Sequence, residues 1–206
     1  MSSADTCEQN HLGGRLPLLS NHELSEDQLS LHRQVLDSCV AAATRSRYLA
    51  ALPDGRLIGP FNAMLRAPGI GEAMLSWTRA ISVSLDSAAI DPVVRETVIL
   101  TVAASRQSSY ALYAHTRAAR HAGLSEEAVN ALTDGRPPSD LPPAATVAHR
   151  LARALTGSAA VDDATYAEAV STFGVTQVVA LVSLVGQYLT TCAILSCFDV
   201  PAPTVP

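Results

Sequence analysis

The chain has 206 residues, 48% of them hydrophobic and 16% charged, and its formal net charge is −5. This length and composition predict one compact domain with a substantial core. The acidic balance excludes nucleic acid and anionic membranes as partners, and because all fourteen basic residues are arginine, Schiff-base chemistry on a lysine is excluded too.

Residues 1–24 are polar and irregular and predict a flexible N-terminal arm. Residues 25–206 are expected to form a single helical domain. Its first helix is predicted over 26–52, where apolar residues recur at helical spacing until Pro53-Asp54-Gly55 ends the pattern. A short turn at 61–65 and a helix over 70–85 follow.

Capping residues mark the helices in the middle of the chain. Asp91-Pro92 starts a helix that runs to about Ser105, because the aspartate accepts from free amides and proline suits the first helical position. The next helix, over 109–121, ends at Gly123, a residue that readily adopts the left-handed conformation. Ser125 caps another short helix. Further helices are expected over 144–155, 163–173 and 175–197. No strand-length alternation is present, so the predicted fold class is all-α.

The segment 175–197 carries no charged residue across 23 positions, which meets the length criterion for a membrane span. It also contains threonine, serine and glutamine residues and has neither an aromatic belt nor a flanking basic cluster. A helix that is apolar nearly all round is typical of the centre of a bundle or of an oligomer interface. We therefore expect no membrane association.

Neither a C-x-x-C pair nor metal-ligand spacing is present among Cys7, Cys39, Cys192 and Cys197. No secretory signal is visible at the N-terminus, so free thiols in the cytoplasm are expected. Cys192 and Cys197 are too far apart along a helix for an unstrained disulfide. The histidines also lack ligand spacing, and we expect neither a metal nor a cofactor.

The candidate chemistry lies between Glu96 and Gly123. Glu96 lies one turn inside a helix whose other faces are mostly apolar, and a carboxylate in such surroundings needs a partner. His115 shares one helix face with Ser108 and Ala111, and a histidine can give or take a proton near neutral pH. The pair is expected to act as a proton shuttle. The alternatives are a surface Glu96 and a histidine that only packs.

The register of Glu96, Ser108, Ala111 and His115 resembles the signature of the carboxymuconolactone decarboxylase and alkylhydroperoxidase D superfamily. Segments 54–65, 95–100 and 184–188 are also similar to such sequences, so the resemblance covers roughly residues 50–203. It implies an alkylhydroperoxidase D-like multi-helix bundle that assembles as a homo-oligomer, either a trimer, a dimer or a hexamer.

The chain departs from that family at two places. In the peroxidase branch, a redox cysteine pair falls on the positions that are Ser108 and Ala111 here, so peroxidase chemistry of that type is not expected. In the decarboxylase-like branch, the tract reads Tyr-Glu-Trp before its histidine, whereas Tyr110 is followed by Ala111 and Leu112. These replacements predict a remodelled and more apolar pocket.

Tyr110 is expected either to donate its phenol to a developing oxyanion or to pack as an ordinary aromatic residue. In related proteins the loop at 59–62 lies near the pocket. Arg56 or Arg66, which flank this loop, or Arg95 is expected either to clamp a substrate carboxylate or to make a surface ion pair. The candidate substrate-binding residues are therefore Ser108, Ala111, Leu112, Arg56, Phe61 and Asn62.

Together these features predict a cofactor-independent acid–base enzyme that acts on a small molecule, an activated carbonyl or lactone compound. Decarboxylation, isomerisation and cyclisation all remain open, and the apolar replacements favour a tailoring enzyme of specialised metabolism. The opposing hypothesis is a non-catalytic relic of the fold that serves binding or assembly. The surroundings of Glu96 discriminate between them: a buried Glu96 beside His115 in a pocket favours the enzyme.

Overall fold

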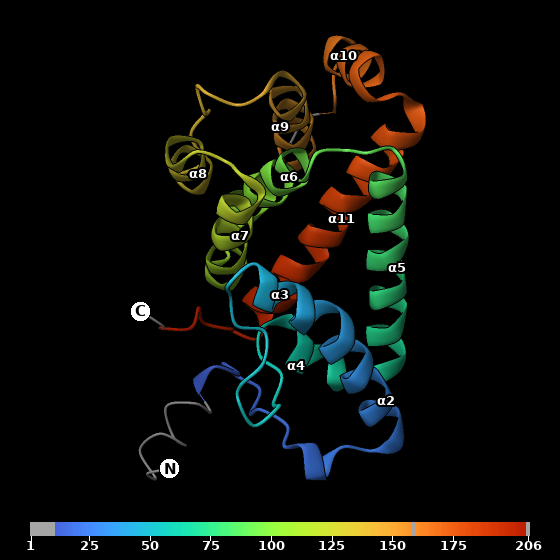
Figure 1. The fold of residues 1–206 in the computed structure, drawn as a ribbon, viewed down its shortest axis with the longest axis vertical. Helices are drawn as coiled ribbons and strands as arrows, with labels where there is room; N and C mark the ends of the chain where they lie inside the picture. Colours follow the sequence, from blue (N-terminus) through green and yellow to red (C-terminus); the bar gives the residue numbers. More distant parts are fainter. Residues whose placement is uncertain (1–10, 158–159, 205–206) are drawn as a thin grey trace.

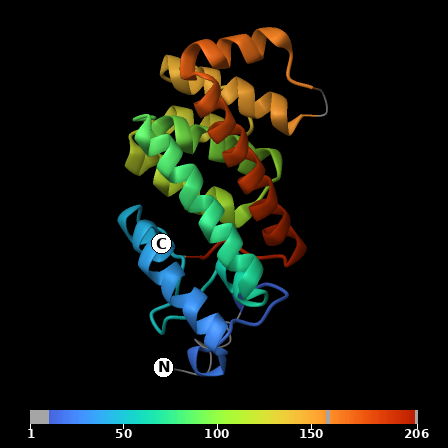
Figure 2. The same ribbon diagram turned by 90° about the vertical axis from the view of Figure 1, so that its right-hand side faces the viewer.

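The computed structural model describes residues 11–157 and 160–204, which form an elongated stack of helices (Figures 1 and 2). Within that part of the chain the only strand-like pairing is an isolated bridge between Ala51 and Leu57, so the all-α class is confirmed. The helices are α2 (Glu26–Val35), α3 (Ala41–Arg45), α4 (Pro60–Leu65), α5 (Pro68–Ser87), α6 (Pro92–Ser105), α7 (Ser109–Ala122), α8 (Glu126–Thr133), α9 (Pro143–Thr156), α10 (Asp163–Phe173) and α11 (Val175–Cys197).

Helix α6 is the centre of the domain and packs against α7, α8, α9 and α11. Its start is the predicted one, because the Asp91 side chain accepts from the amide of Val93 and Pro92 occupies the first turn. A helix that is apolar on almost every side must be enclosed by its neighbours. The buried side chains of α6 are Val93, Val94, Thr97, Val98, Ile99, Leu100, Thr101, Val102 and Ala103.

Helix α11 crosses the domain diagonally, beside the upright α5 (Figure 1), and packs against α4, α5, α6, α9 and α10. By length and composition it is the one described helix that could span a membrane. Its inner face is buried in the bundle, whereas Val175, Val179 and Val182 on the other side are exposed. The packing accounts for the apolar inner face, and the exposed valines leave an apolar outer face.

The first helix is shorter than the 26–52 predicted from the sequence, and that prediction is wrong beyond Arg45. A π-helical turn, Leu36–Val40, separates α2 from α3, and the chain leaves the helix through Arg47, whose φ is 59°. The following residues pair across the turn at Asp54-Gly55 instead of continuing the helix. The amide of Leu52 donates to the carbonyl of Arg56, and the amide of Ile58 to that of Ala50.

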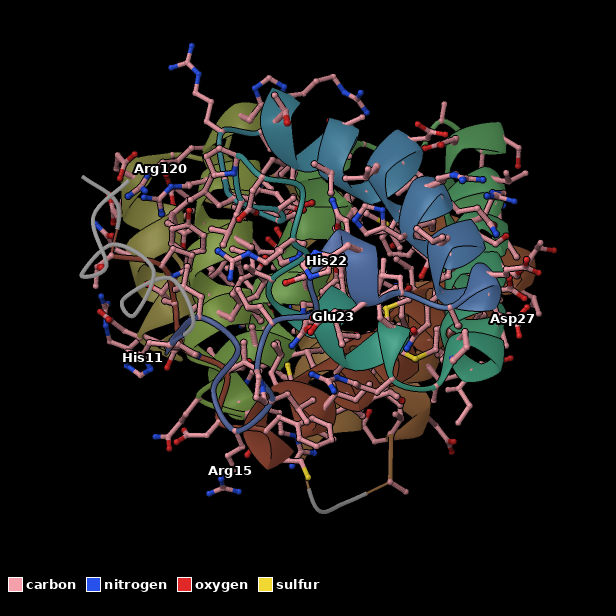
Figure 3. All side chains as sticks on the ribbon, turned by 90° about the horizontal axis from the view of Figure 1, so that it is seen from below. His11, Arg15, His22, Glu23, Asp27 and Arg120 are labelled. Atoms are coloured by element: carbon pink, nitrogen blue, oxygen red, sulfur yellow. The ribbon has the colours of Figure 1, made fainter. Side chains whose placement is uncertain are left out.

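Residues 11–24, the described part of the predicted arm, pack against α4 and the end of α11. The amide of Arg15 donates to the Phe198 carbonyl and its guanidinium to the Cys197 carbonyl, while Leu18 is buried in a cluster with Ile58 and Val200. Figure 3 views the molecule from this end, with His11, Arg15, His22 and Glu23 labelled along the segment. This part of the arm is therefore a packed segment, and the rest of it lies outside the described residues.

Candidate active site

Two antiparallel neighbours, α6 and α7, bring Glu96 and His115 together. The loop between them is short because Gln107 adopts a φ of 49° and Ser108 begins the new helix. The Glu96 carboxylate lies 2.8 Å from Nδ1 of His115, and the two side chains are only 12% and 13% exposed. This is the buried arrangement that the enzyme hypothesis requires.

The other nitrogen of His115 meets a residue from α11. The Tyr188 hydroxyl lies 2.9 Å from Nε2, although the two residues are 73 positions apart in sequence. When a neutral His115 donates its Nδ1–H to Glu96, Nε2 presents a lone pair that accepts from the Tyr188 O–H. Glu96, His115 and Tyr188 thus form one hydrogen-bonded chain, which we call the Glu–His–Tyr chain.

Electrostatics favour a neutral phenol at the end of this chain. Burial raises the pKa of Tyr188 well above its ordinary value, and the negative charge of Glu96 raises it further. Tyr188 therefore keeps its proton at neutral pH. A neutral phenol held in a low-dielectric site is a strong hydrogen-bond donor to an oxygen that gains charge.

The Glu–His–Tyr chain opens into a cavity of about 200 Å³ between α4, α5, α7 and α11. Its wall is mostly apolar, with Phe61 and Met64 from α4 and Ala111 from α7 among the lining side chains. His115 and Tyr188 both line it, whereas Glu96 supports His115 from behind. Such a concave, apolar space with a few convergent polar groups is the usual form of a small-molecule site.

Comparisons with known proteins agree with this architecture. The model of the carboxymuconolactone decarboxylase family matches residues 72–154, a span that contains both Glu96 and His115. A peroxidase-related protein from Ralstonia eutropha JMP134 with an alkylhydroperoxidase AhpD core shares the fold, with a TM-score of 0.72, 13% identity and 93% of each chain covered. The chain is therefore similar to the carboxymuconolactone decarboxylase family over residues 72–154 and has an alkylhydroperoxidase D-like fold.

A second solved structure similar to this carboxymuconolactone decarboxylase-like chain is that of a variant of the debrominase Bmp8 in complex with 2,3,4-tribromopyrrole. It aligns with a TM-score of 0.67 and 12% identity, covering 91% of this chain and 90% of that one. At these identities the two structures establish the fold alone. A search of curated proteins gave no match.

The sequence left two roles open for Tyr110, a donor to the substrate or a packing aromatic residue, and its hydroxyl bonds to the backbone. Its ring lines the cavity, but its O–H donates to the Leu49 carbonyl at 2.7 Å, and the Tyr113 hydroxyl accepts from the Leu49 amide. Both tyrosines therefore hold the loop after α3 in place. The tyrosine whose hydroxyl bonds to His115 at the cavity is Tyr188.

The remaining sequence candidates divide into two groups. Phe61 and Ala111 line the cavity. The other four, Ser108, Leu112, Arg56 and Asn62, are not among the residues that line it.

Each of these four has a structural setting of its own. Ser108 is buried beside the Cys192 thiol, and Leu112 packs in the core. The Arg56 side chain donates to Asp54. Asn62 accepts from the Leu19 amide and donates to the Leu16 carbonyl, so it fastens residues 11–24 to α4.

Sequence reasoning missed Tyr48 and Cys39, which both line the cavity. Cys39 lies in the π-helical turn, a local widening that helices often show at functional sites, and burial raises the pKa of its thiol. The sequence predicted a regular helix over 26–52, and that prediction gave no indication of the π-helical turn. In the described part of the chain, no three histidine, cysteine, aspartate or glutamate side chains come together as metal ligands.

Proposed function

We propose that this protein is a cofactor-independent acid–base enzyme acting on an activated carbonyl or lactone compound. One observation carries the proposal: the Glu–His–Tyr chain is largely shielded from solvent and ends in a cavity suited to a small molecule. A histidine oriented by a carboxylate and paired with a neutral phenol supplies both partners that proton transfer next to a carbonyl requires.

The proposed step uses the bond between Tyr188 and His115. In the free protein Tyr188 donates to Nε2. A substrate carbonyl that enters accepts the Tyr188 O–H instead, which frees the Nε2 lone pair. Nε2 then takes the proton from the carbon next to the carbonyl, the C–H electron pair forms a C=C bond, and the carbonyl electrons move to the oxygen held by Tyr188. Glu96 stabilises the imidazolium that results.

The next step decides the reaction type. If the imidazolium returns its proton to a different carbon, the reaction is an isomerisation. If the enolate carbon attacks an electrophile in the same molecule, the reaction is a cyclisation. If the enolate instead arises by loss of CO₂ from a carboxylate, a His115 that has first taken a proton from solvent gives it to the enolate carbon, and the reaction is a decarboxylation. All three use the same groups.

The family and fold fit an enzyme of the tailoring type that needs no cofactor. The debrominase with this fold binds 2,3,4-tribromopyrrole, a small ring compound. A ring compound of specialised metabolism is therefore a reasonable substrate class for this chain as well. The burial of Glu96 beside His115 counts against a non-catalytic relic, because an exposed Glu96 would be expected there.

The experiment is a screen of cyclic ketones and lactones for exchange of the carbon-bound hydrogen next to the carbonyl with deuterium from D₂O, followed by ¹H NMR. We expect the parent protein to accelerate exchange of at least one compound. His115→Gln removes the base and should abolish that acceleration, while Arg150→Gln, at an exposed position of α9, serves as the control. Exchange that is equally fast in the parent and in His115→Gln would refute the proposal.

A further inference from the structure

The polar groups in the cavity wall are all neutral or part of the Glu–His–Tyr chain. No arginine or lysine is among the residues that line the cavity in the described ranges. The Gln187 amide donates to the Thr78 hydroxyl, and that hydroxyl donates to the Met74 carbonyl, so this side of the wall offers only neutral groups. The polar lining residues are Cys39, Tyr48, Thr78, Tyr110, His115, Gln187, Tyr188 and Thr191.

The cavity disfavours negatively charged groups. Burial raises the pKa of the Cys39 thiol and of the Tyr48, Tyr110 and Tyr188 phenols, four groups whose ionised forms are anions. The charge of Glu96 adds to the effect at Tyr48 and Tyr188. A carboxylate ligand would meet the same desolvation and the same repulsion.

The cations near the site lie outside the wall. Arg79 on α5 is exposed to solvent and only partly offsets the effect of burial on Cys39. Arg56, a candidate clamp from the sequence, pairs with Asp54 and does not line the cavity. His115 also lines the cavity, but Glu96 lies 2.8 Å from its Nδ1, so the pair presents no unbalanced positive charge to a ligand.

From this wall we infer that the substrate is an uncharged, largely apolar carbonyl compound of about the size of one substituted ring. The inference rests on the proposed function. A cavity of about 150 Å³ in an apolar core holds one benzene ring, so a cavity of about 200 Å³ has room for a ring with a small substituent. An uncharged substrate favours isomerisation or cyclisation over decarboxylation, because decarboxylation starts from a carboxylate.

The test uses benzamide and benzoate, which have nearly the same shape and differ in charge. Each is titrated into ¹⁵N-labelled protein, and the shifts of the Ala111 and Ala114 amides, whose residues line the cavity, report binding. We expect benzamide to bind at least about 10-fold more tightly than benzoate. The free-energy difference behind this ratio is only a modest part of the cost of burying a carboxylate without a partner. Glu96→Gln removes the negative charge without changing the size of the side chain, so it should reduce the preference for benzamide over benzoate.

Benzoate binding as tight as that of benzamide would overturn the inference, and so would the failure of both probes to shift these amides. The result is separable from the proposed function. If His115→Gln abolishes deuterium exchange while benzoate binds well, the acid–base function stands and the uncharged substrate class falls. If benzamide is preferred but no carbonyl compound exchanges, the proposed function falls and the charge selectivity of the cavity remains.

Discussion

Tyr188 meets the ring of His115 edge-on, with its hydroxyl 2.9 Å from Nε2 and the two ring planes at 87°. Tyr110 lines the same cavity, but its hydroxyl donates to the Leu49 carbonyl. Two tyrosines in one wall therefore have different partners, one an imidazole and one a backbone carbonyl. This difference separates a proposed catalytic residue from a structural one.

Replacing each tyrosine by phenylalanine tests this distinction. Tyr188→Phe should lower kcat by about 100-fold or more, because it removes one donor to the developing oxyanion. Tyr110→Phe should leave kcat within a few-fold but lower the free energy of unfolding by about 1–2 kcal/mol, since the part-buried Leu49 carbonyl loses its partner. Steady-state kinetics and urea unfolding measure the two effects. The opposite pattern would return the oxyanion role to Tyr110.

Glu96→Gln should preserve the fold and lower turnover by at least about 100-fold, the usual scale for general acid–base catalysis. Glutamine can still accept from Nδ1, but it lacks the charge that stabilises the imidazolium. Circular dichroism checks the fold and the deuterium-exchange assay checks turnover. Full activity of a folded Glu96→Gln protein would remove Glu96 from the mechanism.

We expect no dithiol-dependent peroxidase activity. The thiolate is the nucleophile in that chemistry, and burial raises the pKa of both Cys39 and Cys192. Among the described cysteines, Cys39, Cys192 and Cys197 are all free thiols. Peroxide consumption coupled to a dithiol is the measurement. Activity that disappears in Cys39→Ser or Cys192→Ser would show that the protein is a peroxidase after all.

The outer face of α11 is expected to form the interface of a homo-oligomer. Val175, Val179 and Val182 are exposed there, with Trp77 of α5 beside them. Light scattering should give a mass at least twice the 21.6 kDa of one chain in the absence of detergent. Val182→Glu should yield a folded monomer, because an exposed carboxylate costs the isolated chain little. An oligomer that survives this change would place the interface elsewhere.

The sequence predicts the helices best where a cap marks their ends. Asp91 and Ser125 start α6 and α8 as predicted, and Gly123 ends α7 with a φ of 100°. The end of the first helix is missed because Arg47, an ordinary residue in the left-handed region, breaks it. The helix ends there because residues 50–52 pair with residues 56–58, and no sequence pattern near Arg47 predicts that pairing.

For the site, the pair Glu96 and His115 follows from the register of two adjacent helices. Tyr188 could not be assigned in the same way, because its hydroxyl reaches His115 only through the packing of α11 against α6. The choice between Tyr110 and Tyr188 depends on which hydroxyl finds a backbone carbonyl, and that is a matter of loop geometry. Cys39 was hidden because a π-helical turn changes which face of the helix it occupies.

Gly59 adopts a φ of 64°, and a Cβ atom there would come within 2.2 Å of the Tyr110 ring. Any larger residue would displace that ring and release the loop that it fastens through Leu49. The two positions should therefore vary together among homologous sequences. Where a homologue carries a side chain at the position of Gly59, a residue smaller than tyrosine should replace Tyr110, and the cavity should be wider on that side.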